Sequence, residues 1–255
     1  ERIQTSKHKI KTHWLIDEYV KIKEILENTA YEGQSLFAAL SFFEVTTILA
    51  FHVFQQLKTD INVIEVGLGG RLDATNIISP KLTAITSISF DHEELLGTTL
   101  EEIAWEKLGI TRPQIPLFWN IDAEKSPLPE KALARKQAEI NFPLFRRNHD
   151  FFLHNDLVHV CQEGTILNTP LPERVRYFPE PLKEIFCTAI ALAFSYLKNR
   201  QRNLTLYDLF VAYEKEKTWP PSLFGRCMEY DYRAHKLMLD VCHNEDSVKA
   251  FVAYI

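Results

Sequence analysis

The spacing of apolar residues along the chain separates helical stretches from strand-like ones. In several stretches apolar residues recur every three or four positions, which is the period of a helix with one buried face. These stretches predict helices over residues 13–28, 35–56, 98–108, 129–139, 180–199, 205–216 and 246–254. Short β-branched or alternating runs predict strands over residues 61–66, 82–89, 116–119, 227–230 and 236–241, and a hairpin over residues 150–161.

The order of these elements predicts the fold class and the domain organisation. Strands that alternate with helices favour an α/β fold, with a mostly parallel sheet covered by helices on both faces. Two prolines within residues 217–222 oppose regular structure, so this segment is the best candidate for a linker. We therefore expect a first domain over residues 1–219 and the beginning of a second domain over residues 220–255.

Composition places the chain among globular proteins and excludes several kinds of partner. It has 255 residues, of which 46% are apolar and 25% charged, and its formal net charge is −5. This mild acidity argues against nucleic acid as a main partner, because phosphate binding requires clustered cations. The longest apolar run, residues 36–54, is interrupted by polar side chains and predicts a buried helix, not a membrane span. Four widely spaced cysteines predict free thiols in a reducing compartment.

Glycine is concentrated in one segment that follows an expected strand. Three of the eight glycines lie within residues 67–70, between Glu65 and Arg71. Ligands bind at the carboxyl ends of parallel strands, where Glu65 could hold a cation. The glycines would let backbone N–H groups approach a phosphate or carboxylate that Arg71 also contacts. The alternative is a glycine-rich turn with an unrelated acidic residue, and spacing alone leaves both open.

Other polar residues at the ends of expected elements are candidates for chemistry. Asp91 and His92 follow the strand at 82–89, where the imidazole could bind a metal and the carboxylate orient it. A purely structural Asp-His pair fits equally well. Lys107 ends a helix, which is typical of a surface lysine that complements the helix dipole. Asp240 and His243 lie at the end of the last expected strand. They could contact a ligand, or Asp240 could be a capping residue and His243 a surface histidine.

Considered together, five stretches resemble the folylpolyglutamate synthase/dihydrofolate synthase family, which is related to the Mur ligases. They are SFFEVTT at 41–47, EVGLGGRLDATN at 65–76, DHEELLGTTLEEIAWEKLGI at 91–110, GR at 225–226 and DxxHN at 240–244. They follow the order of the family, with 27 residues from Glu65 to His92 and 15 more to Lys107. The EVGLGGRLDATN string favours the folate branch over the Mur ligases.

The resemblance implies a fold and a reaction. The fold would be a P-loop-type α/β domain followed by a Rossmann-like α/β domain, with the active site between them. The reaction would be ATP-dependent amide formation, in which a carboxylate of dihydropteroate or a folate takes the γ-phosphoryl group of ATP. The amine of L-glutamate then attacks the acyl phosphate. The implied cofactors are ATP and Mg²⁺, and the implied protein is a cytoplasmic monomer without nucleic-acid or membrane partners.

The resemblance also implies roles for individual residues. Glu65 and His92 would be magnesium ligands, and Lys107 would be the lysine that the family carbamylates to support a second cation. The three would form the catalytic group. Arg226 and Asp240 would contact ATP from the linker and the second domain. The residues that would line the pterin site are Ser41, Phe42, Phe43, Glu44, Leu72, Asp73 and Ala74.

The sequence departs from the family pattern in several places. It has no Gly-Lys dipeptide, and the family's phosphate-binding loop would precede Glu1. We therefore expect a part of a longer protein, inactive by itself. Phe224 replaces the proline of a Pro-Gly-Arg motif, and an asparagine that contacts adenine is replaced near Phe186. The alternatives are a Mur-type peptide ligase and, if the phosphate-binding loop is truly absent, a non-catalytic relative.

Overall fold

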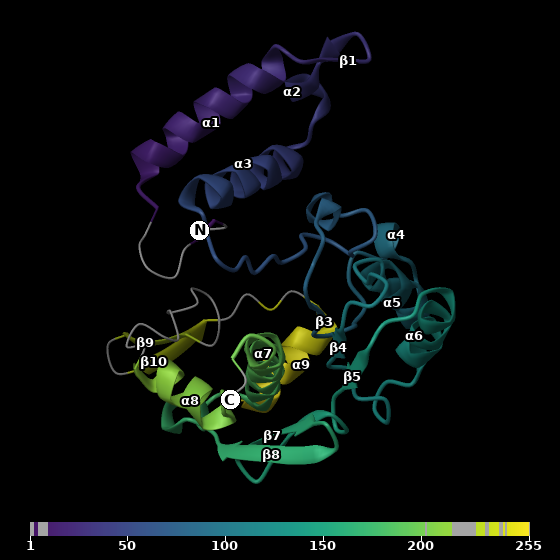
Figure 1. The fold of residues 1–255 in the computed structure, drawn as a ribbon, viewed down its shortest axis with the longest axis vertical. Coiled ribbons are helices and arrows are strands. Elements are labelled where there is room, and N and C mark those ends of the chain that lie inside the picture. The colour runs from purple at the N-terminus through teal and green to yellow at the C-terminus, as the bar shows by residue number, and fades with distance from the viewer. Residues whose placement is uncertain are drawn as a thin grey trace. The chain divides into compact units, whose positions relative to one another are not determined.

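The chain forms two compact units, Glu1–Ile78 and Ser79–Ile255 (Figure 1). The computed structural model describes residues 3, 4, 10–201, 203–215, 228–232, 235–239, 242 and 244–254. Each unit has a hydrophobic core of its own. The domain boundary expected between residues 219 and 220 lies outside the described residues and stays a prediction.

The first unit is built on two helices, α1 (Thr12–Glu27) and α3 (Phe42–Leu57). Their apolar faces form a small core of Ile22, Leu26, Val45, Leu49 and Val53. Between them lie a hairpin of β1 (Ala30–Tyr31) and β2 (Gln34–Ser35), and the short helix α2 (Leu36–Ala39). The helix predicted over residues 13–28 is therefore confirmed.

The single helix predicted over residues 35–56 is in fact two helices, α2 and α3. The chain leaves helical geometry at Leu40, and α3 begins with Ser41 as its N-cap residue. The Ser41 hydroxyl accepts a hydrogen bond from the Glu44 N–H at 3.2 Å, and the Glu44 carboxylate accepts one from the Ser41 N–H at 2.7 Å. This capping box satisfies backbone donors that a continuous helix would have paired. The apolar period continues across the break, so periodicity alone misses it.

Residues 61–66 do not form the strand that their β-branched run predicts. Ile61 is 52% exposed and Val63 is 91% exposed, and none of the described strands pairs with this segment. A strand is stabilised by hydrogen bonds to a neighbouring strand, so side-chain preference alone does not create one. The following loop contains the 3-10 helix η1 (Ala74–Ile77).

The second unit contains a three-stranded parallel sheet in the order β3-β4-β5. Its strands are β3 (Thr83–Ile85), β4 (Leu117–Trp119) and β5 (Leu144–Arg146). β3 is much shorter than the strand predicted over residues 82–89, and β5 was not predicted. The helices that connect the strands are α4 (Glu93–Leu96), α5 (Leu100–Leu108) and α6 (Leu128–Glu139), and α5 lies beside α6 (Figure 1).

An antiparallel sheet follows the parallel one. Its strands are β6 (Phe151–His154), β7 (Leu157–Gln162) and β8 (Thr165–Pro170). The predicted hairpin is confirmed, because Asn155 and Asp156 form its turn with positive φ angles of 49° and 57°. The third strand, β8, was not predicted. The sequence-based expectation of a mostly parallel sheet is thus met only in part, by a mixed α/β structure.

Two long helices cover the antiparallel sheet and complete the core. They are α7 (Glu180–Lys198) and α8 (Leu206–Lys215), and the short 3-10 helix η2 (Glu173–Val175) precedes them. The core of this unit includes Phe118, Phe151, Val158, Phe194 and Phe210. The last described elements are a hairpin and a helix, β9 (Met228–Tyr232), β10 (His235–Leu239) and α9 (Glu245–Tyr254).

Among the described residues, no helix has the length and apolar character needed to cross a membrane. Cys161, Cys187 and Cys242 are free thiols, and Cys227 lies outside the described residues. Burial raises the pKa of the Cys187 thiol to about 12, so this side chain stays protonated and inert at neutral pH.

Candidate functional site

The glycine-rich loop of the first unit is folded around the side chain of Asp73. One carboxylate oxygen of Asp73 accepts hydrogen bonds from the backbone N–H groups of Gly67 and Leu68, at 2.9 and 3.0 Å. The other accepts from the backbone N–H and the hydroxyl of Thr75, at 2.9 and 2.6 Å. Asp73 thereby fixes the loop and caps η1. Its implied role in substrate binding stays a prediction.

Phe43 packs its ring directly against Gly67. A methyl group placed on Gly67 would lie 2.5 Å from the ring atom Cζ of Phe43, so any side chain there would displace the ring. The close approach explains why glycine occupies this position. The implied pterin-site residues therefore divide into two groups: Phe43 and Asp73 hold the loop, whereas Phe42 and Leu72 are 82% and 79% exposed.

Ser41 and Glu44, two further implied substrate contacts, are engaged with each other. Besides the two backbone bonds of the capping box, the Ser41 hydroxyl donates to the Glu44 carboxylate at 2.7 Å. These hydrogen bonds, first that of the hydroxyl and then that of the backbone N–H, lower the pKa of Glu44 below its ordinary value. The described contacts thus give both residues a local structural role at the start of α3.

The Asp91-His92 pair of the second unit lies beyond the end of β3. β3 ends at Ile85, and an irregular segment separates it from Asp91. His92 has a left-handed backbone conformation, with φ 49° and ψ 43°, and precedes α4. Its Nε2 atom lies 3.7 Å from a carboxylate oxygen of Asp91, and its side chain is 56% exposed. Histidine tolerates this backbone region better than most residues, and its imidazole is accessible to solvent.

Lys107 is half-buried in the last turn of α5, where a basic side chain also complements the helix dipole. Burial lowers the pKa of the Lys107 amine, and the nearby Asp91 carboxylate acts in the opposite direction. The neighbouring Trp105 ring is covered by Arg135, whose guanidinium carbon lies 4.0 Å from the ring centre. This packing of α5 on α6 holds the last turn of α5, with Lys107, against the body of the unit.

Asn244, a residue to which the sequence assigned no role, contacts the cluster formed by Asp91, His92 and Lys107. Its amide donates a hydrogen bond to a carboxylate oxygen of Asp91 at 3.3 Å. The two residues are 153 positions apart in the sequence. The DxxHN motif draws attention to Asn244, but no local signal identifies its partner.

The other implied ligands do not complete a cation site within the described residues. Glu65 is exposed and lies in the first unit, whereas His92 lies in the second. No three His, Cys, Asp or Glu side chains of the described segments are close enough together to hold a metal ion. The carboxylate fits the oxygen preference of a divalent cation such as Mn²⁺ or Mg²⁺, and the imidazole is a further nitrogen donor to a divalent metal. Arg226 and Asp240, the implied ATP contacts, lie outside the described residues.

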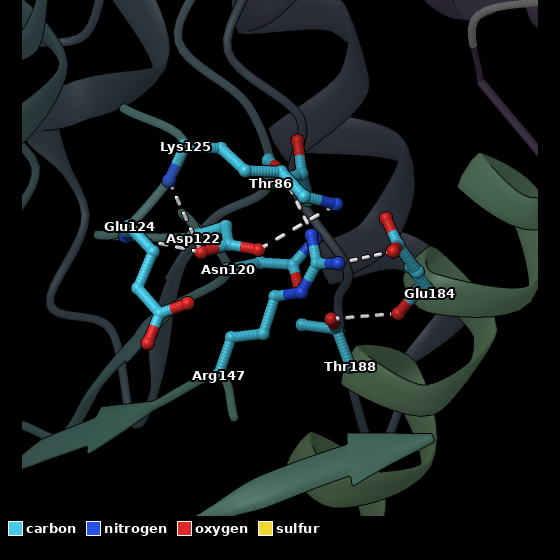
Figure 2. Close-up of polar contacts among 8 residues, drawn as sticks. All are labelled: Thr86, Asn120, Asp122, Glu124, Lys125, Arg147, Glu184 and Thr188. Carbon is cyan, nitrogen blue, oxygen red and sulfur yellow. Dashed lines mark hydrogen bonds and ion pairs between the residues drawn. The ribbon is translucent and has the colours of Figure 1, made fainter. Parts of the chain in front are cut away.

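A second polar cluster lies where β4 and β5 end, at the edge of the sheet where α/β proteins bind ligands. Figure 2 shows Arg147 paired with Glu184 of α7, while Asp122 accepts hydrogen bonds from the backbone of Glu124 and Lys125. A cavity of about 360 Å³ opens beside the Arg147–Glu184 pair, with Asn120 on another wall. Sequence reasoning did not identify this cluster.

Phe186, the position near which the family's adenine-contacting asparagine is replaced, belongs to the core. Its ring packs edge-on against Phe210 and Tyr213, with ring centres 6.0 and 5.0 Å apart. It therefore stabilises the packing of α7 on α8, and it offers no polar group to a nucleotide.

Comparison with solved structures defines the class of protein first. The chain has the fold of folylpolyglutamate synthases: it aligns with the apo form of L. casei FPGS at a TM-score of 0.70 and 24% identity, covering 97% of this chain and 58% of the other. It also aligns with a bifunctional folylpolyglutamate synthase/dihydrofolate synthase bound to Mn, AMPPNP and L-glutamate. That alignment has a TM-score of 0.72 and 28% identity, and covers 96% of this chain and 53% of the other.

Sequence comparison then finds relatives of the same kind. The chain is 36% identical over 146 residues to the mitochondrial folylpolyglutamate synthase of Bos taurus, which covers 57% of this chain and 24% of the bovine protein. It is 49% identical over 88 residues to the dihydrofolate synthase/folylpolyglutamate synthase of Haemophilus influenzae. This alignment covers 34% of this chain and 20% of the Haemophilus protein. No family model matches the chain. The chain is thus similar in sequence and in fold to members of the folylpolyglutamate synthase/dihydrofolate synthase family, and it spans little more than half the length of the solved relatives.

Proposed function

We propose that the protein to which this sequence belongs is an ATP-dependent ligase that adds L-glutamate to dihydropteroate, to folates or to both. The observation that carries the proposal is the shared fold, over 96% of this chain, with a bifunctional synthase whose structure holds Mn, AMPPNP and L-glutamate. The reaction begins with transfer of the γ-phosphoryl group of ATP to a substrate carboxylate. Attack by the glutamate amine then forms the amide and releases phosphate.

We assign the cation to Glu65 and His92, and the nucleotide to Arg226 and Asp240. A divalent cation bound there would neutralise charge on the phosphoryl group during its transfer. The exposed carboxylate of Glu65 would supply the oxygen donor that such a cation prefers, and the exposed imidazole of His92 would add a nitrogen donor. The exposed Phe42 and Leu72 side chains would cover the pterin ring, with Ser41, Phe43, Glu44, Asp73 and Ala74 shaping the loop beneath it.

We further propose that Lys107 is carbamylated. Carbamylation joins the neutral amine to CO₂, forms an N–C bond, releases one proton and turns a cation into a carboxylate-like group. The half-buried position of Lys107 favours this step, because burial lowers the pKa of the amine and so increases its neutral, reactive fraction. ¹³C NMR in ¹³C-bicarbonate should show a carbamate signal that disappears in the Lys107→Met variant.

Further assignments follow from the same proposal. The described parallel sheet would be part of a P-loop-type domain with helices on both faces, and β9, β10 and α9 would open a Rossmann-like second domain. The protein would act as a cytoplasmic monomer. Size-exclusion chromatography with light scattering, and fractionation of the source cells, test these two points.

Phosphate release tests the proposed reaction directly. The full-length protein is mixed with ATP, Mg²⁺, L-glutamate and either dihydropteroate or tetrahydrofolate. We expect phosphate release that requires both glutamate and the pterin substrate. Release with a nucleotide-sugar peptide instead would indicate a Mur-type ligase, and no release with any of them would indicate a non-catalytic relative.

The variant Glu65→Gln separates the proposed cation role from general damage. An amide keeps the size of the side chain but loses the charge, so activity should fall about tenfold or more. The control is Glu32→Gln, an exposed glutamate in the β1–β2 turn, whose activity should equal that of the unchanged protein. Equal activity in all three proteins would refute the assignment of Glu65.

A further inference from the structure

Asn244 connects two parts of the second unit that are distant in the sequence. It directly precedes α9, and its side chain contacts Asp91, next to His92. The contact is the described hydrogen bond that joins α9 to the cluster of Asp91, His92 and Lys107. Asn244 itself is half-buried, which shields this bond from competing water.

The hydrogen bonds of Asn244 determine which of its two side-chain atoms faces Asp91. The oxygen Oδ1 accepts from the backbone N–H of Ser247 at 2.9 Å, so this position must be the carbonyl oxygen. The amide nitrogen Nδ2 therefore faces the carboxylate, as a donor to an acceptor. In the reverse direction, the Ser247 hydroxyl accepts from the Asn244 N–H at 3.1 Å. This reciprocal arrangement caps α9 and holds the asparagine in one rotamer.

Asp91 is the residue through which Asn244 can act on its neighbours. One oxygen of Asp91 receives the Asn244 amide, and the other lies 3.7 Å from Nε2 of His92. A carboxylate held from one side presents a fixed second oxygen to the imidazole on its other side. Partners of this kind orient metal-binding histidines, and their loss typically weakens metal binding.

We propose that Asn244 is a positioning residue that holds the Asp91 carboxylate beside His92 and so ties the start of α9 to the proposed cation site. The inference rests on the proposed function for the cation, while the contact itself is independent of it. Its consequence is that α9 and the His92 turn are ordered together. Weakening the contact therefore reduces cation affinity without altering the cation ligands themselves.

The variant Asn244→Ser tests this role because serine caps helices about as well as asparagine but has no amide to reach Asp91. It also leaves the net charge unchanged. The affinity of the full-length protein for Mn²⁺ alone is measured from the electron paramagnetic resonance signal of the free ion. In Asn244→Ser this affinity should fall about threefold to tenfold. The loss is at or below the roughly tenfold or larger loss that is typical for partners of metal-binding residues, because Asn244 acts through Asp91. The control Ser247→Ala removes the hydroxyl of the cap and keeps the Asp91 contact, so its affinity should change less than twofold.

A double-mutant cycle then shows whether the effect passes through Asp91. In an Asp91→Ala background, Asn244→Ser should cause no further loss of Mn²⁺ affinity. Equal losses in both backgrounds, or equal losses in Asn244→Ser and Ser247→Ala, would mean that Asn244 only caps α9, and would overturn the proposal.

Hydrogen exchange tests the contact without any cation. Asn244→Ser should increase amide exchange in α4, whereas Ser247→Ala should increase it only in the first turn of α9. Unchanged exchange in α4 would overturn the positioning role. If the unchanged protein binds no Mn²⁺, the proposed function of the cation site fails and the cation role of Asn244 fails with it, but the exchange result still decides whether Asn244 holds Asp91.

Discussion

The glycine-rich loop of the first unit and the Asp91–Lys107 region of the second are held in opposite ways. Asp73 holds the loop through hydrogen bonds to residues at most six positions away. The second region depends on burial and on distant residues: Lys107 is half-buried on α5, and Asn244 reaches Asp91 across 153 positions. The loop thus takes its shape mainly from its own hydrogen bonds, with added packing of the Phe43 ring of α3 against Gly67. A cluster held by packing keeps its shape only when its unit is folded.

The largest expected effect is on the free energy of unfolding, which should depend on the buried core near the second region and not on the exposed segment before the loop. Ile103 of α5 is fully buried, so Ile103→Ala should reduce the free energy of unfolding by about 2–5 kcal/mol. Val63, which precedes the glycine-rich loop, is 91% exposed, so Val63→Ala should change it by less than about 0.5 kcal/mol. Urea unfolding measures both. Similar losses in the two variants would contradict the exposure of residues 61–66.

Asp73→Asn should produce the next largest effect, confined to the loop. The amide keeps the size of the side chain but replaces one acceptor oxygen by a donor that faces N–H groups. Local opening of residues 67–75 should therefore become easier by about 2 kcal/mol, measured by hydrogen exchange. Asp60→Asn, at an exposed position of the same unit, is the matched control and should leave exchange unchanged. Faster exchange throughout the chain would mean that the loop is not held locally.

Gly67→Ala should cost less, because the atom that it meets is the end of a side chain. The new methyl group would lie 2.5 Å from Cζ of Phe43, and the ring must shift to admit it. We expect a loss of about 1 kcal/mol in stability, at the low end for inserting a methyl group into a packed site. Phe43→Leu in the same protein should recover part of the loss. Full additivity of the two substitutions would show that they do not touch.

The smallest expected effect concerns the pH dependence of the second region. The pKa of Lys107 is lowered in the folded protein, so between that pKa and the ordinary value the unfolded chain binds more protons. The free energy of unfolding should therefore rise with pH across that interval, relative to Lys107→Met. The exposed Lys131 should show no such difference when it is replaced by methionine. A decrease with pH would mean that the attraction of Asp91 outweighs burial.

Much of the local structure could be predicted from sequence, as particular residues show. The turn at Asn155-Asp156 was predicted because these residues tolerate positive φ, and helix α5 because its apolar period and acidic first turn agree. β5 was missed because three residues carry little periodicity of their own, and β8 because its six residues, TILNTP, do not alternate between apolar and polar. The strand expected at residues 61–66 failed because pairing depends on a neighbouring strand, which the composition of the segment does not reveal.

In the candidate site, too, the sequence identified residues, whereas only the structure showed their burial and their contacts. The motif residues Glu65, His92 and Lys107 were identified from the family resemblance: Glu65 lies in the first unit, and His92 and Lys107 lie in the second, where Asp91 is near both. The burial of Lys107 could not be foreseen, because a lysine in the last turn of a helix is ordinarily solvated. Asn244 was visible as part of a motif, but its contact with Asp91 was not.

The sequence by itself determined most of the longer helices, the hairpin turn at Asn155-Asp156 and the motifs of the family that the chain resembles. These features depend on hydrogen bonds and periodicities that extend over only a few positions. The tertiary structure alone decided that no described strand pairs with residues 61–66, that Lys107 is half-buried and that Asn244 donates a hydrogen bond to Asp91. These three depend on which distant segments pack together, because burial and long-range hydrogen bonds arise only when the chain is folded.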